Sequence, residues 1–104
     1  MAKYLYVYHG GGSMPQSKEE IDKVMQAWGG WFGSLGAAVV DGGNPVGKSI
    51  TVKNGSVVDN GGANPASGYS IIEASSAEDA AAKAKGCPLL AHGGSVEIAE
   101  ILPM

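Results

Sequence analysis

The sequence predicts a small α+β domain in which two helices cover one face of an antiparallel sheet. Two segments have the three- to four-residue apolar spacing of amphipathic helices, and several short segments have the composition or alternation of β-strands. Their order along the chain is strand, helix, strand, hairpin, strand, helix, strand. This order is typical of the split βαβ arrangement of ferredoxin-like sandwiches. The length of 104 residues fits one domain, residues 1–104.

The first strand and the first helix have the clearest patterns. Residues 3–9 (KYLYVYH) are aromatic and β-branched and stop at three glycines, as does a strand that ends in a loop. Ser17 and Glu20 have the spacing of a capping box, which predicts a helix start. The apolar stripe of this helix consists of Ile21, Val24, Met25, Trp28, Phe32 and Leu35.

The middle of the chain predicts two short strands and a hairpin. Residues 37–41 form an apolar run that predicts a strand, and residues 49–53 alternate between apolar and polar side chains. The dipeptide Asn54-Gly55 is a strong type I′ turn signal, because both residues tolerate a positive φ. Residues 56–59 therefore form the returning strand of a hairpin.

The last third of the chain predicts a strand, a helix and a strand. Residues 69–74 (YSIIEA) and residues 96–102 (VEIAEIL) have strand composition. Between them, residues 75–85 form an alanine-rich helix that begins with a second capping box, Ser75 and Glu78.

Both faces of the first strand are apolar. Tyr4, Tyr6 and Tyr8 point to one face, while Leu5 and Val7 point to the other. Two helices can cover only one face of a sheet. A second sheet from an identical chain is the most economical cover for the other face, so the sequence predicts a homodimer.

Composition excludes several classes of protein. The net charge of −3 and the lack of arginine argue against a nucleic-acid module, which needs a cationic face. No basic amphipathic helix and no run of about 20 apolar residues indicates a membrane protein. A single cysteine allows no internal disulfide, and no export signal is recognisable, so we expect a cytoplasmic protein.

Residues 42–49 (GGNPVGKS) satisfy the phosphate-loop pattern letter for letter. That motif works because it opens a helix whose first N–H groups hold the phosphates. Here a β-branched run and a hairpin follow instead, so we interpret the segment as a turn.

Neither a metal site nor a reactive thiol is expected, and no cofactor is implied. The two histidines lie 83 positions apart, and no ligand spacing connects them with carboxylates. Cys87 follows the end of a helix, the wrong end of the dipole for a thiolate, and is interpreted as a packing residue.

Candidates for acid–base chemistry lie at strand ends. Asp41 and Asp59 precede glycine-rich loops, so each either caps its loop or acts as a general base. His9 ends a strand, where it is either a simple edge residue or a group that titrates near neutral pH. A cofactor-free isomerase or lyase would use such an Asp with His9 or a tyrosine hydroxyl. This chemistry requires two of these groups, or one of them and Tyr69, within about 4 Å beside a cavity.

A binding protein is the leading interpretation. Tyr6, Tyr8 and Tyr69 would supply amphipathic walls for an apolar or aromatic small molecule, together with Tyr4. The alternative for this tyrosine stripe is packing against a second copy. A structural subunit whose inner faces are fully packed is a third hypothesis.

Several blocks of the chain resemble YCII-related proteins of the branch named for a DGPF motif. Residues 68–74 (GYSIIEA), Cys87-Pro88 and residues 93–98 (GGSVEI) resemble the second half of that family. Residues 3–9 and residues 40–45 (VDGGNP) resemble its first half.

The resemblance implies a ferredoxin-like fold that pairs into a dimeric α+β barrel. Some relatives carry a histidine in the first helix and an aspartate before the penultimate strand, but the first helix here has no histidine. Asp59 stands where the aspartate of the motif falls, yet Asn60-Gly61-Gly62 follows in place of Gly-Pro-Phe. The barrel hosts several reactions and therefore selects none. The branch is often linked with extracytoplasmic-function sigma factors, which implies a regulatory association.

Overall fold

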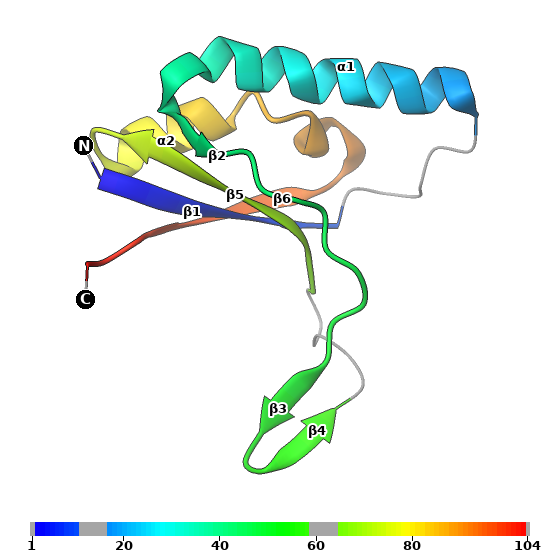
Figure 1. The fold of residues 1–104 in the computed structure, drawn as a ribbon, viewed down its shortest axis with the longest axis vertical. Coiled ribbons are helices and arrows are strands. Elements are labelled where there is room, and N and C mark those ends of the chain that lie inside the picture. Colours follow the sequence, from blue (N-terminus) through cyan, green and yellow to red (C-terminus); the bar gives the residue numbers. More distant parts are fainter. Residues whose placement is uncertain (1, 11–16, 59–64, 104) are drawn as a thin grey trace.

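The computed structural model describes residues 2–10, 17–58 and 65–103, and it has an α+β fold (Figure 1). A four-stranded antiparallel sheet has the strand order β2-β5-β1-β6, and two helices pack against it. The elements of this body are β1 (Ala2–His9), α1 (Lys18–Leu35), β2 (Val39–Asp41), β5 (Ala66–Ala74), α2 (Ala77–Ala84) and β6 (Ser95–Glu100). Short 3₁₀ helices, η1 (Gly36–Ala38) and η2 (Pro88–His92), connect them.

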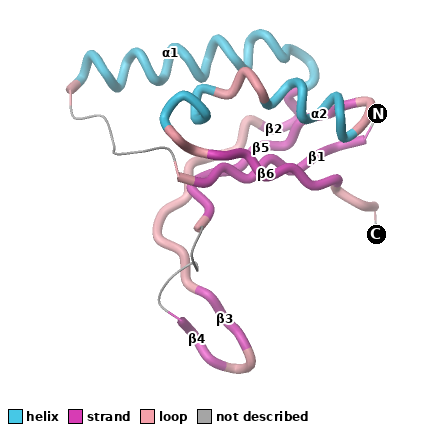
Figure 2. The backbone as a smooth tube through the Cα atoms, turned by 180° about the vertical axis from the view of Figure 1, so that it is seen from behind, coloured by secondary structure: helices cyan, strands magenta, loops and turns pink. Residues whose placement is uncertain are grey.

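Both helices lie on the same side of the sheet, as Figure 2 shows from behind. The remaining strands, β3 (Thr51–Lys53) and β4 (Ser56–Val58), form a separate two-stranded sheet away from this body. The sequence predicted this hairpin and its turn. Asn54 and Gly55 both have a positive φ, 52° and 79°, as a type I′ turn requires.

The local patterns place most elements within a few residues of their observed bounds. Ser17 caps α1 as predicted, since its hydroxyl accepts a hydrogen bond from the N–H of Glu20 at 3.1 Å. The predicted cap of α2 is wrong by one residue. Ser76 is the N-cap, and its hydroxyl oxygen accepts a hydrogen bond from the N–H of Asp79 at 3.0 Å. The Asp79 carboxylate in turn accepts hydrogen bonds from the backbone N–H and the hydroxyl of Ser75, the residue before the cap.

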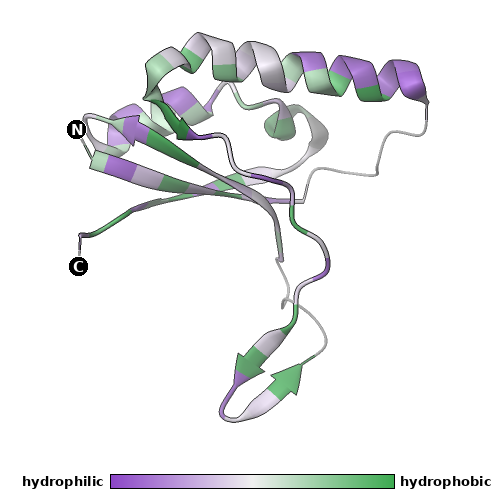
Figure 3. Ribbon diagram, in the orientation of Figure 1, coloured by the Kyte–Doolittle hydropathy of each residue, from purple (hydrophilic) through white to green (hydrophobic). Residues whose placement is uncertain are grey.

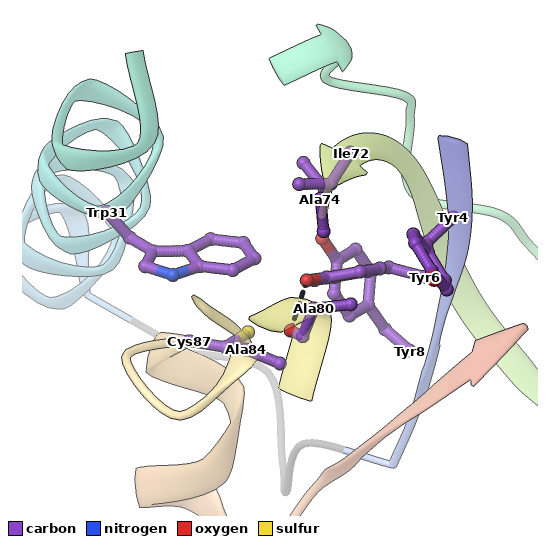
Figure 4. Packing of buried hydrophobic residues seen from close by; sticks show 9 residues of the cluster. All are labelled: Tyr4, Tyr6, Tyr8, Trp31, Ile72, Ala74, Ala80, Ala84 and Cys87. Carbon is purple, nitrogen blue, oxygen red and sulfur yellow. Dashed lines mark hydrogen bonds between the residues drawn. The ribbon is translucent and has the colours of Figure 1, made fainter. Parts of the chain in front are cut away.

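The hydrophobic core lies between the sheet and the two helices (Figure 4). Tyr4, Tyr6 and Tyr8 of β1 are buried under the helices, so these three do not pack against a second copy. Trp31 of α1 packs against Tyr6 and Tyr8 and donates its indole N–H to the carbonyl of Lys83 at 3.0 Å, which joins the two helices. The buried cluster comprises Tyr4, Tyr6, Tyr8, Trp31, Ile72, Ala74, Ala80, Ala84 and Cys87.

Hydrogen bonds satisfy the buried tyrosine hydroxyls. The Tyr6 hydroxyl donates to the carbonyl of Ala80, the contact dashed in Figure 4. The Tyr8 hydroxyl donates to Ser70 Oγ at 2.7 Å, and the Ser70 hydroxyl donates to the carbonyl of Gly42 at 2.7 Å. Among the described residues no buried side-chain polar atom is unpaired. The aromatic core therefore has few alternative arrangements, since every polar group in it has a fixed partner.

The opposite face of the sheet has an apolar centre, and none of the described helices lies over it. Leu5 lies directly between Ile71 of β5 and Ala99 of β6, and Val7 lies opposite Tyr69. Apart from the exposed Ala99, these side chains are only half-buried. None of the helices in the described part of the chain has the length and hydropathy that spanning a bilayer would need.

Alkaline pH tests the burial of Tyr6. Burial, with a smaller effect of Asp79, raises the pKa of Tyr6 to about 12. An unfolded tyrosine ionises near pH 10, so the unfolded state loses this proton first and the free energy of unfolding falls between about pH 10 and 12. In urea unfolding experiments, we expect the free energy of unfolding of Tyr6→Phe to fall less over this range than that of the wild type. The difference between the two proteins grows by up to about 1.4 kcal/mol per pH unit. Identical pH dependence in both proteins would contradict the burial of the phenol.

Candidate ligand-binding cavity

A cavity of about 560 Å³ opens between α1 and the sheet. Its volume is within the range of small-molecule sites. The wall on α1 consists of Met25, Trp28 and Phe32. Facing them are Tyr8 of β1, residues 67–69 of β5, the loop of residues 42–45, and Leu89 of η2.

The aromatic wall is held by ring contacts. The rings of Tyr8 and Trp28 meet edge to face with centroids 5.1 Å apart, and those of Trp28 and Phe32 are 5.9 Å apart. Behind them, Trp31 contacts both Trp28 and Phe32, at 5.7 and 5.0 Å. Because Trp31 is also hydrogen-bonded to α2, the wall is built on a fixed support.

The loop opposite this wall is bound to the edge of β5. The N–H of Tyr69 donates to the carbonyl of Asn44 at 3.2 Å, and the N–H of Val46 donates to the carbonyl of Ser67 at 3.0 Å. Gly43 crosses β5 so closely that a Cβ there would lie 1.7 Å from the Tyr69 carbonyl oxygen. Its φ of 72° also belongs to the left-handed region, so this crossing requires glycine.

None of the described residues that line the cavity carries a charged side chain. The Ser67 hydroxyl is already used, donating to the carbonyl of Tyr8 at 3.1 Å. In contrast, the side-chain amide of Asn44 and the indole N–H of Trp28 hydrogen-bond to no described residue. The cavity thus offers aromatic surface and a few neutral polar groups. Such a lining suits an uncharged apolar or aromatic molecule.

Of the three predicted ligand-binding tyrosines, Tyr8 and Tyr69 border the cavity. Tyr69 does so where Gly43 crosses β5. Tyr6 is fully buried beneath α2, with its hydroxyl bound to Ala80, and does not line the cavity.

The predicted catalytic residues do not line the cavity where they are described. The Asp41 carboxylate accepts a hydrogen bond from the N–H of Gly43 at 2.8 Å, as a loop-capping residue does. His9 contacts Pro65 and Glu97 on the other side of the sheet from the core tyrosines. Asp59 lies outside the described residues, so its pairing with His9 stays a prediction.

His9 lies between a backbone carbonyl and a carboxylate. Its Nδ1 lies 3.2 Å from the carbonyl oxygen of Pro65, and its Nε2 lies 3.0 Å from Glu97 Oε1. His9 is buried while Glu97 is largely exposed. The pair therefore ties the start of β5 to β1 and β6.

Two sequence interpretations are confirmed. Cys87 is 3% exposed, and burial raises the pKa of its thiol, so it is a packing residue. Residues 42–49 open no helix, since β3 follows and Pro45 pairs with Gly68. Among the described residues, no three His, Cys, Asp or Glu side chains come together as metal ligands.

Sequence reasoning did not identify the α1 wall as part of a site. Met25, Trp28 and Phe32 were assigned to the packing stripe of the helix, which has the same spacing.

Comparison of the sequence with models of known families and with curated proteins finds no match. The functional argument therefore depends on the geometry of the cavity.

Replacing Gly43 tests the loop that closes the cavity. Gly43→Ala forces a methyl group against the Tyr69 carbonyl at a positive φ, so we expect a loss of at least about 2 kcal/mol in the free energy of unfolding. Gly47→Ala is the matched control. A Cβ at Gly47 meets no atom within 4 Å, and we expect a change within about 0.5 kcal/mol by urea unfolding. Equal effects of the two substitutions would contradict the close crossing.

Proposed function

We propose that the protein is a homodimeric binding protein that holds a small, uncharged aromatic or apolar molecule between α1 and the sheet. The uncharged aromatic cavity is the observation that supports this function most strongly. A ligand ring would lie against Trp28 and Phe32, while the Asn44 amide and the Trp28 N–H would orient its polar groups.

Homodimerisation is supported by the open face of the sheet. The side chains of Leu5, Val7 and Ile71 form its apolar centre, and a second sheet is the cover that matches its shape. The position of β5 between β1 and β2 agrees with a split βαβ arrangement, and so supports a ferredoxin-like fold. A dimeric α+β barrel follows if two such sheets pair.

The resemblance to YCII-related proteins stays a prediction, as does the sigma-factor association that it implies. An isomerase or lyase is not favoured by a specific contact, because His9 and Asp41 are both committed to structural hydrogen bonds.

Binding can be tested with the neutral fluorophore N-phenyl-1-naphthylamine. We expect its emission to rise with the wild-type protein while tryptophan emission is quenched, since Trp28 lines the cavity. Met25 is 67% exposed at the rim, so Met25→Glu leaves the fold intact and places a carboxylate beside the apolar site. We expect affinity for the fluorophore to fall about tenfold, which corresponds to about 1.4 kcal/mol.

The matched control is Gln26→Glu, which adds the same charge at an exposed position one residue along α1, outside the cavity. Its affinity should equal that of the wild type. No fluorophore binding to the wild type, or equal loss in both variants, would contradict the proposed site.

A further inference from the structure

The β3–β4 hairpin, which we call the arm, stands apart from the body of the protein. Within the described part of the chain, β3 and β4 form a sheet of their own, and the arm projects from the side of the main sheet opposite the helices (Figures 1 and 2). A lone two-stranded hairpin in water is marginally stable at best. The arm therefore needs a surface to pack against.

Both strands of the arm contain hydrophobic residues, which are green in Figure 3. Val52 and Val57 lie directly opposite each other in the hairpin, so their side chains share a face, and they are 69% and 67% exposed. Ile50, two residues before Val52, extends the same face and is 62% exposed. The other face carries Lys53 and Ser56, which also lie opposite each other, together with the pair Thr51 and Val58.

A second apolar surface is exposed on the N-terminal half of α1. This half extends beyond the end of the sheet, on the side where the arm leaves the body (Figure 1). Ile21 and Met25 on this half are exposed. We call this surface the α1 overhang.

The total surface of the chain is larger than that of a compact monomer. The chain exposes 6982 Å², whereas a compact monomer of 10.5 kDa exposes about 5,400 Å². The excess, about 1,500 Å², exceeds the roughly 800 Å² that each partner buries in a stable interface. The Cα radius of gyration, 14.9 Å, is likewise above the value of about 13 Å for a compact chain of this length.

We propose that the arm of each chain clasps the second copy, packing Ile50, Val52 and Val57 on the α1 overhang of its partner. This inference rests on the proposed homodimer. In that dimer the arm points toward the partner, because it projects from the open face of the sheet.

The arm is long enough for this contact. The arm extends from Val46, whose N–H is hydrogen-bonded to β5, to Gly55 in the turn. When extended, residues 46–55 span about 30 Å. Sheet and helix layers stack about 10 Å apart, so the arm passes the sheet of the partner and reaches its helices. A two-fold axis makes the contact reciprocal. Each arm then lies beside Met25, at the rim of the partner's cavity.

Disulfide trapping between two different variants tests the contact directly. The chain has one cysteine, which is buried, so engineered thiols react alone. The two variants Ile21→Cys and Val57→Cys are mixed in equal amounts so that their subunits exchange, and the mixture is mildly oxidised. We expect a covalent dimer on a non-reducing gel. Ala81→Cys, exposed on α2, replaces Ile21→Cys in the control mixture, which should stay uncrosslinked. Crosslinking that is equal in both mixtures, or absent from the first, would overturn the proposal.

Sedimentation velocity provides a second, independent test. Val57→Lys places a charge on the apolar face of the arm, and we expect the dimer dissociation constant to rise at least tenfold. Ser56→Lys adds the same charge on the other face and should leave the constant within about twofold of the wild type.

The outcomes separate the two proposals. A dimer that is equally stable in Val57→Lys overturns the clasp and leaves the homodimer and its cavity standing. A wild type that sediments as a monomer overturns both the homodimer and the clasp. Fluorophore binding to the wild-type protein is measured separately and tests the ligand site.

Discussion

The rest of the structure depends on the way in which β1 uses its two faces. One face presents Tyr4, Tyr6 and Tyr8 to the helices, and the hydroxyls of Tyr6 and Tyr8 are hydrogen-bonded within the chain. That face fixes α1 through Trp31 and thereby sets the height at which the helix lies above the sheet. The other face presents Leu5 and Val7, which no described helix covers, and the proposed homodimer would bury this face.

The cavity is a consequence of the same packing. Trp31 fills the space between the helices and the centre of the sheet, but toward the N-terminal half of α1 the layers are no longer filled. There the loop at Gly43 crosses the edge of β5 and forms the opposite wall. The cavity thus lies where the hydrophobic core around Trp31 ends, and it is not formed by a separate inserted segment. This explains why its lining is aromatic and uncharged.

Most of the fold could be predicted because it depends on local patterns. Alternation along β1, the cap at Ser17 and the Asn54-Gly55 turn each determine their element within a few residues. The cap of α2 was misplaced because Ser75 and Ser76 are equivalent in sequence, and only the Asp79 contacts distinguish them. The cavity could not be predicted, since Trp28 and Phe32 have the same spacing whether they face a core or a void. The separation of the hairpin from the main sheet likewise depends on tertiary contacts alone.

Native mass spectrometry of the wild-type protein, purified gently from its own cells, tests the central claim most directly. It reports the number of subunits and any retained small molecule in one spectrum. The account predicts a dimer that carries a discrete additional mass, that of a small uncharged compound, which is released on collisional activation. A bare monomer at micromolar concentration would contradict it, because both the open sheet face and the aromatic cavity would then have no occupant.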